Sequence, residues 1–325
     1  MPIMRLLAVA AVLLAGIPPA SAQSWPTRRL TMVVPFAAGG ASDVIGRIVA
    51  EGLRVELGQS VIVENIGGAG GMIGAARVAK APPDGYQMLL GNVGTHAQNQ
   101  SLYKKPLYDA ATDFAPVALV TNQSLVLVVR NDFPADDLQT FITYAKAHQA
   151  ELKYGSAGIG GSNHLACALL NALIGIDVTH IPYRSGAEAM QDMLAGRVDY
   201  QCPSAPVALP QIKAKTVKAL ANLSRSRSPS IPDLPSAHEQ GLIDCDLPSW
   251  YALFLPAGTP AEIVQTLNRA TIATLETPLV QRHLKEIGSD LVPPEQMSPD
   301  YLGGFVAAEI AKWARVIKAS GIELD

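Results

Sequence analysis

Short apolar runs rich in β-branched residues alternate with longer amphipathic segments along most of the chain. The runs end at glycine, proline or polar positions, as buried strands do. They are too short to be buried helices. The pattern therefore predicts strands at 30–36, 60–66, 87–91, 115–120, 125–130, 152–155, 178–183, 198–202, 217–223 and 252–255.

The segments between these runs have the periodicity and the start signals of helices. In 41–57, apolar residues from Val44 to Leu53 recur on one face of a helix. Ser185 and Glu188 have the spacing of a capping box, which predicts a helix start at that point. Strands that alternate with helices are typical of α/β proteins, so we expect mainly parallel sheets flanked by helices.

Two irregular stretches suggest that the chain builds two lobes. The stretch 121–124 separates two neighbouring strand candidates with no helix between them, and 241–249 precedes another strand. A chain that leaves one lobe, builds a second and then returns would have this organisation. We therefore expect lobe 1 to hold 23–122 and 248–325 and lobe 2 to hold 123–247, with a hinge between them.

The first 22 residues have the features of a secretory signal peptide. Arg5 precedes an apolar run over 6–17, and Ala20-Ser21-Ala22 follows as a small-residue cleavage site. The alternative is a membrane anchor, but the run is shorter than the roughly 20 residues of a spanning helix. We expect cleavage after Ala22 and export of the mature chain.

Composition and charge argue against a nucleic-acid partner. The formal net charge is −3, and neither a cluster of Lys and Arg nor an aromatic platform for bases is present in the sequence. Of the three cysteines, none forms a CxxC pair, which argues against structural zinc. Export permits a disulfide, and Cys202 with Cys245 is the pair considered first. The alternative is three buried thiols, with Cys167 in an apolar helical stretch.

Three glycine-rich loops each follow a strand and open a helix, at 35–43, 65–71 and 155–164. A helix N-terminus offers unpaired N–H groups and a partial positive charge, which suit an anion. Glycine lets a ligand approach the backbone, although one such loop alone would be an ordinary tight turn. Loops in both lobes favour an anion held in the crevice between them.

The sequence lacks the motifs of nucleotide-binding proteins, serine hydrolases and zinc proteases. The segment Gly68 to Gly74 has GxGxxxG spacing rather than GxGxxG, and the sequence contains no P-loop, GxSxG or HExxH pattern. We expect no catalytic residue, metal or cofactor. Asp43, in the first turn of its helix, is expected to stabilise the helix N-terminus; the alternative is that it repels or orients the polar end of a ligand.

Several motifs together resemble one known family. They are PFAAGGASD at 35–43, ENIGGAGG at 64–71, PDGY at 83–86, YGSAG at 154–158, SNHL at 162–165, IPYR at 181–184 and LPAGTP at 255–260. This chain is similar, in order and over nearly its whole length after residue 22, to the tripartite tricarboxylate transporter substrate-binding receptors, also called the Bug or TctC receptors.

The resemblance implies a type II-like, two-lobed periplasmic binding protein. Such a receptor delivers a small carboxylate to a membrane permease without altering it, and we expect it to act as a monomer. The resemblance places these residues at the ligand: Phe36, Ala37, Ala38, Gly39, Gly40 and Asp43; Asn92, Gly94 and Thr95; Ser156, Ala157, Gly158, Gly161, Ser162 and His164; and Tyr183 and Gln201.

One position departs from the family pattern. Gln201 places an uncharged amide where many relatives have an acid near the ligand. We therefore expect a dicarboxylate, a tricarboxylate or an aromatic acid as the ligand, rather than an amino acid selected by its ammonium group. Two alternatives remain open at this point: a sensing module for a signalling membrane protein, and a secreted hydrolase.

Overall fold

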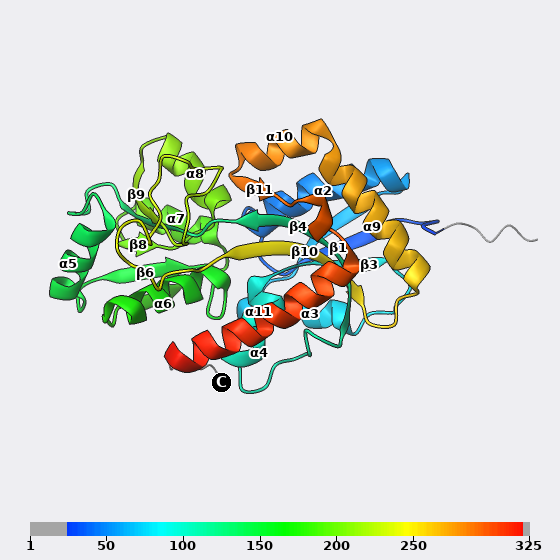
Figure 1. Ribbon diagram of the computed structural model, residues 1–325, viewed down its shortest axis with the longest axis horizontal. Helices are drawn as coiled ribbons and strands as arrows, with labels where there is room; N and C mark the ends of the chain where they lie inside the picture. Colours follow the sequence, from blue (N-terminus) through cyan, green and yellow to red (C-terminus); the bar gives the residue numbers. More distant parts are fainter. Residues whose placement is uncertain (1–24, 321–325) are drawn as a thin grey trace, which may run out of the picture.

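The computed structural model describes residues 25–320 and contains two β-sheets, each flanked by helices (Figure 1). The first sheet has the strand order β11-β4-β10-β3-β1-β2 and the second the order β7-β6-β8-β5-β9. Their bounds are β1 Leu30–Val34, β2 Val61–Asn65, β3 Gln87–Asn92, β4 Phe114–Gln123, β5 Val126–Arg130, β6 Lys153–Ser156, β7 Thr179–Pro182, β8 Tyr200–Gln201, β9 Val217–Asn222, β10 Ser249–Pro256 and β11 Ser289–Leu291. The signal peptide predicted at residues 1–22 lies outside the described residues.

Helices cover both sheets (Figure 1). In the lobe of the six-stranded sheet lie α2 Ala41–Leu57, α3 Met72–Ala79, α4 Asn99–Leu102, α9 Ala261–Glu276, α10 Pro278–Glu286 and α11 Pro299–Ser320. In the lobe of the five-stranded sheet lie α5 Leu138–His148, α6 Ser162–Ile174, α7 Gly186–Leu194 and α8 Ala205–Lys213. The short turns are η1 Ala69–Gly71, η2 Gly94–Gln98 and η3 Pro294–Gln296. Within residues 25–320, no helix has both the length and the apolar character needed to cross a bilayer.

The two-lobed α/β fold expected from the sequence is confirmed, but the sheets are mixed rather than mainly parallel. Strand β1 pairs in parallel with β2 and β3, whereas β10 is antiparallel to both β3 and β4. In the second sheet β5 is antiparallel to both of its neighbours. Strands β5 and β10 are antiparallel to their neighbours because each enters its sheet directly from the other lobe, not through a crossover helix that would restore its direction. Strand β11 follows β10 through α9 and α10 and runs antiparallel to β4 as β10 does.

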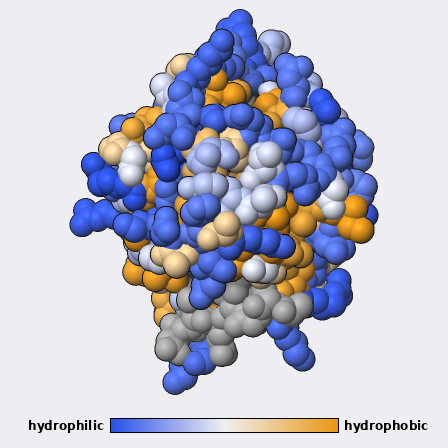
Figure 2. All heavy atoms as spheres, turned by 90° about the vertical axis from the view of Figure 1, so that its left-hand side faces the viewer, coloured by the Kyte–Doolittle hydropathy of each residue, from blue (hydrophilic) through white to orange (hydrophobic). Residues whose placement is uncertain are grey.

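The ten predicted strands each overlap a strand of the structure, and helix 41–57 begins and ends as expected. The strand missed is β11, which has three residues and pairs only with the end of β4. Figure 2 shows the outer face of the five-stranded lobe, which is mostly hydrophilic. Exposed apolar side chains of this lobe include Leu173, Leu194 and Ile243.

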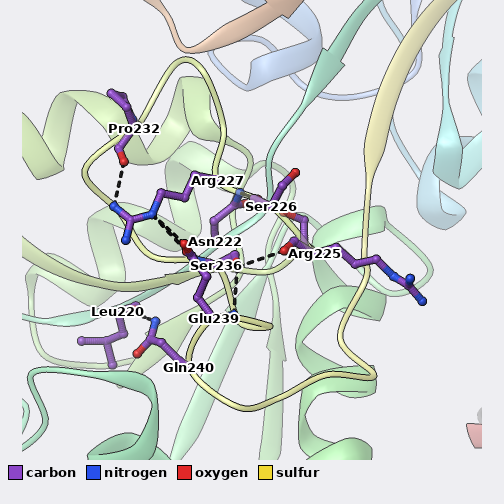
Figure 3. Close-up of polar contacts among 10 residues, drawn as sticks. Leu220, Asn222, Arg225, Ser226, Arg227, Pro232, Ser236, Glu239 and Gln240 are labelled. Carbon is purple, nitrogen blue, oxygen red and sulfur yellow. Dashed lines mark hydrogen bonds and ion pairs between the residues drawn. The ribbon is translucent and has the colours of Figure 1, made fainter.

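The chain crosses to the second sheet between β4 and β5 and returns through the long segment between β9 and β10. An ion pair holds this return segment in shape, because the Arg227 guanidinium bonds both carboxylate oxygens of Glu239 at 3.0 and 3.1 Å (Figure 3). Arg227 also donates to the carbonyl of Pro232, and Gln240 donates to the carbonyl of Leu220 on β9. The segment is thereby fixed to the second sheet before the chain leaves that lobe.

The cysteine pairing differs from the one considered first. Cys167 on α6 is bonded to Cys202, which directly follows β8, and Cys245 is a buried free thiol. The expectation that Cys167 stays a core thiol was therefore wrong as well. The reason is tertiary: α6 packs over the end of β8, and this brings two side chains together that are 35 residues apart in sequence.

We predict that this disulfide contributes about 4 kcal/mol to the free energy of unfolding, because it closes a loop of 35 residues. Denaturant unfolding of the Cys167→Ser/Cys202→Ser double variant measures the loss. The Cys245→Ser variant serves as a control that lacks a thiol but keeps the bond. A linked peptide containing Cys245, found by mass spectrometry after digestion without reduction, would contradict the assignment.

Candidate ligand site between the lobes

A small pocket lies where the two lobes meet, and we call it the proximal pocket. It encloses about 480 Å³. Residues of both lobes line it: Phe36, Gly40, Ala41, Ser42, Asn92 and Tyr251 from the first, and Ala157, Ser162, Asn163, Ser185, Gly186, Pro203, Ser204 and Val207 from the second. None of these described residues carries a charged side chain.

Four helices begin at the proximal pocket. Helix α2 follows Gly40, α6 begins at Ser162, α7 follows Ser185 and α8 follows Ser204. The first N–H groups of a helix have no partner inside the helix. The N-cap residues of α2, α6 and α8 make no side-chain hydrogen bond to them, whereas Ser185 accepts one from the N–H of Glu188. The dipoles of these helices therefore favour an anion in the pocket, although none of its described lining residues is a cation.

Polar side chains add neutral donors and acceptors to this wall. The Ser42 hydroxyl donates to Tyr251 Oη at 3.3 Å, and both residues are buried. Burial raises the pKa of Tyr251, so its hydroxyl stays protonated and can donate to a ligand. Asn163, which also lines the pocket, accepts through Oδ1 from the N–H of Ala157 at 3.2 Å.

A larger hollow, the distal pocket, adjoins the proximal pocket and encloses about 1190 Å³. Phe36 and Ala157 line both pockets. All three glycine loops meet at the distal pocket, whose lining is Phe36, Ala37, Asn65, Gly67, Gly68, Ala69, Gly70, Gly71, Tyr103, Ala157, Gly158, Ile159, Pro182, Tyr183 and Arg184. The two pockets therefore adjoin each other between the lobes, and we call the pair the recess.

The structure distributes the residues expected at the ligand over three positions. Phe36, Gly40, Asn92, Ala157 and Ser162 line the proximal pocket, and Ala37, Gly158 and Tyr183 line the distal pocket. Gly39 borders a neighbouring hollow beside α7 and α8. The remaining eight lie outside the lining of these pockets: Ala38, Asp43, Gly94, Thr95, Ser156, Gly161, His164 and Gln201.

Asp43 holds the first glycine loop in place from behind. Its carboxylate accepts from the N–H of Gly39 at 3.0 Å, from Asn65 at 3.0 Å and from Arg47. Burial alone would raise the pKa of Asp43, but the hydrogen bonds from Arg47, Gly39 and Asn65 outweigh burial and lower it. Asn65 also donates to the carbonyl of Phe36, so the ends of β1 and β2 are tied together.

Ser156 and two histidines support the third loop. Ser156 Oγ lies 2.7 Å from His180 Nε2, accepts from the N–H of Gly158, and is buried. Burial lowers the pKa of His180 to about 3, with a contribution from His164, and lowers that of His164 to about 4, so both rings are neutral at pH 7. The pair resembles a nucleophile with its base, but the serine is engaged by its own loop and does not line the described pockets.

Thr95 and Gln201 are buried as well. The Thr95 N–H donates to Asn92 Oδ1 at 3.0 Å and fixes the Asn92 side chain at the end of β3. Gln201 is 1 % exposed, and neither its amide nitrogen nor its oxygen has a hydrogen-bond partner within residues 25–320. Such a side chain costs free energy unless water or a ligand group satisfies it.

Several pocket residues were not among the sequence candidates: Ala41, Ser42, Asn163, Ser185, Gly186, Pro203, Ser204, Val207 and Tyr251. Ser185 and Ser204 had a local signal, since each is a serine at a helix start and Ser204 precedes a proline in the first turn. Tyr251 had none. It reaches the pocket because β10 returns from the second lobe and pairs with β3, opposite Asn92.

Two α/β lobes with an uncharged polar pocket at helix N-termini between them are the arrangement of a substrate-binding protein. Residues 45–322 match the tripartite tricarboxylate transporter family receptor, TctC, so the chain belongs to this family. The periplasmic binding protein BugD superposes with a TM-score of 0.89 at 37% identity, covering 92% of this chain and 99% of its own.

Two solved relatives were determined with ligands. MatC from Rhodopseudomonas palustris, with bound malate, has a TM-score of 0.87 and 38% identity, covering 90% of this chain and 100% of its own. The R. palustris protein Rpa4515, with adipate, has a TM-score of 0.87 and 36% identity, covering 92% of this chain and 99% of its own. Both ligands are dicarboxylates.

We predict that Asp43→Ala lowers the free energy of unfolding by about 1–2 kcal/mol at pH 7, because it leaves the Gly39 N–H and Asn65 without their acceptor. The pKa of Asp43 is lowered by folding. Its contribution is therefore complete above the ordinary value of 3.8 and is lost as the pH falls through the lowered pKa. Denaturant unfolding at pH 7 and near pH 3 should show a smaller difference at the acid pH.

Glu51→Ala is the matched control, because Glu51 lies on the same helix in an exposed ion pair with Arg54. This variant should unfold like the unmodified protein at pH 7. Equal losses for the two variants would mean that Asp43 has no special role in holding the loop.

Proposed function

We propose that this chain is an exported receptor that captures a small carboxylate between its lobes and hands it to a membrane permease. Signal cleavage after Ala22, lobe 1 at 23–122 and 248–325, and lobe 2 at 123–247 are part of the proposal. Membership in the family supports the transport role, and the crossings at 123–126 and 222–249 support the division into lobes.

The observation that carries the proposal is the meeting of four helix N-termini at an uncharged pocket. Preorganised backbone N–H groups bind a carboxylate well, because hydrogen bonds to a charged acceptor are strong and no side chain must be ordered. Serine, asparagine and tyrosine groups supply further donors. No lysine or arginine is among the described residues that line the proximal pocket, so the donors to an anion there are neutral groups.

A dicarboxylate, tricarboxylate or aromatic acid fits this recess better than an amino acid. An ammonium group would need an acceptor carboxylate, and the described lining of the two pockets contains none. Gln201, which is buried and lies outside the described lining of both pockets, is an amide rather than an acid. Malate in MatC and adipate in Rpa4515 are ligands of this kind.

Capture would occur by closure of the lobes on the ligand. The lobes touch beside the distal pocket, where Tyr103 Oη donates to the Ile159 carbonyl at 3.2 Å. On the other side a Cβ on Gly40 would lie 3.9 Å from Ser185 Cβ. Because both lobes line the proximal pocket, a ligand bound there interacts fully only with the closed form and shifts the population toward it.

We predict that Gly40→Leu abolishes carboxylate binding and leaves the fold intact. Gly40 has a φ of −84°, which any residue adopts, and a Cβ there meets only ordinary contacts. The longer side chain, however, would enter the proximal pocket. The measurement is a thermal-shift screen of di- and tricarboxylates, aromatic acids and amino acids, in which a ligand at 100 times its Kd adds about 2.7 kcal/mol and several degrees.

Gly304→Leu is the matched control, since Gly304 is an exposed helical residue of α11 with open space around its Cα. This variant should bind as the unmodified protein does. The proposal fails if an amino acid is the tightest ligand, or if folded protein shows no shift with any acid. It also fails if Gly40→Leu retains full affinity.

A further inference from the structure

The two adjoining pockets differ in charge. The proximal pocket has no charged side chain among its described lining residues, whereas the distal pocket has Arg184. The rest of the distal wall is glycine backbone and the side chains of Phe36, Tyr103 and Tyr183, with Asn65 at its edge. Arg184 is therefore the only cation in the described lining of the whole recess.

The backbone on both sides of Arg184 is fixed. The N–H of Tyr183 donates to the carbonyl of Ser156 at 3.0 Å, which attaches this segment to the third glycine loop. The N–H of Arg184 donates to Glu188 Oε2 at 3.1 Å in the first turn of α7. Ser185, the next residue, is the N-cap of α7 and lines the proximal pocket. Arg184 thus extends an exposed side chain from a rigid base that both pockets share.

The hydroxyl of Tyr183 is already bonded to a residue of α7 and is not available to a ligand. Its hydroxyl donates to Asp192 Oδ2 at 2.6 Å, so its hydrogen-bonding capacity is used by α7 and its ring is left to border the distal pocket. Asp192 in turn pairs with Arg197. Among the described residues that border the distal pocket, Arg184 is consequently the group suited to hold a second negative charge.

Phe36 and Ala157 line both pockets, so the pockets adjoin, and the inference requires a single elongated molecule to reach past these two residues from one pocket into the other. A carboxylate at the helix N-termini would leave the remainder of the molecule pointing past these two residues toward Arg184. Arginine binds carboxylate through paired N–H donors, which gives both attraction and orientation.

We propose that Arg184 selects the ligand: it binds the second carboxylate of an extended α,ω-dicarboxylate whose first carboxylate lies in the proximal pocket. The inference rests on the proposed function, since it requires the proximal pocket to bind a carboxylate. The inference goes beyond the proposed function because it assigns the preference for dicarboxylates over monocarboxylates to the side chain of Arg184.

Calorimetric titration with straight-chain dicarboxylates of four to eight carbons, each beside the monocarboxylate of equal carbon number, tests this proposal. The unmodified protein should bind at least one diacid, such as adipate, about tenfold more tightly than its matched monoacid. Arg184→Gln should remove that preference while leaving the monoacid affinity unchanged. Arg184→Lys, which keeps the charge but loses the fork of donors, should restore part of it.

Arg225→Gln is the matched control. Arg225 also lies in the second lobe, has a side chain 74% exposed, and lines neither pocket, so its loss changes the net charge equally. The preference of the unmodified protein should also weaken as salt is raised, since an exposed charge is screened.

The possible failures are distinguishable. If diacids and monoacids bind equally, or if Arg184→Gln keeps the diacid preference, the role of Arg184 is wrong and the proposed function stands. If Arg184→Gln and Arg225→Gln weaken diacids equally, the effect is one of net charge and the inference is likewise overturned. If no carboxylate binds the folded, unmodified protein, the proposed function fails first.

Discussion

An anion buried between two lobes must have its charge balanced, and in the proposed function the dipoles of four helices do this in place of a cation in the proximal pocket. In α/β lobes, helices that follow parallel strands begin at the carboxyl ends of those strands, so their N-termini face the same edge. Helices α2, α6, α7 and α8 begin there, around the proximal pocket. The glycine loops, the serine N-caps and the crevice all lie at this edge, and glycine and serine leave room there for a ligand to approach the helix N-termini.

The loops at this edge depend on support from behind. Asp43 holds the first loop through the Gly39 N–H, and Ser156 with His180 holds the third. The disulfide between Cys167 and Cys202 joins α6, whose first residues line the pocket, to the end of β8, where Pro203 and Ser204 line it. Backbone donors bind tightly only when they are held in place before the ligand arrives. For the proposed function we therefore expect Asp43, Ser156, His180 and the disulfide to affect affinity, although none of them lines the described pockets.

Local patterns in the sequence predicted the strands, the helix over 41–57 and the three glycine loops, because each depends on spacing within a short window. They did not predict which residues of distant segments meet. Tyr251 reaches the pocket through the pairing of β10 with β3, and the cysteine partner was decided by the packing of α6 over β8. The prediction of mainly parallel sheets was wrong for the same reason, because strands β5 and β10 enter their sheets from the other lobe and pair antiparallel with their neighbours. Asp43 and His164 have the residue types of a binding site, yet they lie outside the pocket linings and support its loops.

Backbone N–H groups at helix ends bind a carboxylate without distinguishing what the carboxylate is attached to. A receptor built only on them would bind many acids, so selectivity requires a second region where side chains differ. For the proposed function, that region is the distal pocket, which shares Phe36 and Ala157 with the proximal pocket and has Arg184 as the single cation in its described lining. Its glycine-lined wall places few steric or hydrogen-bonding demands on the middle of a ligand. If the helix ends bind the first carboxylate as proposed, substitutions in the distal pocket should change which acid is bound without disturbing those helix ends.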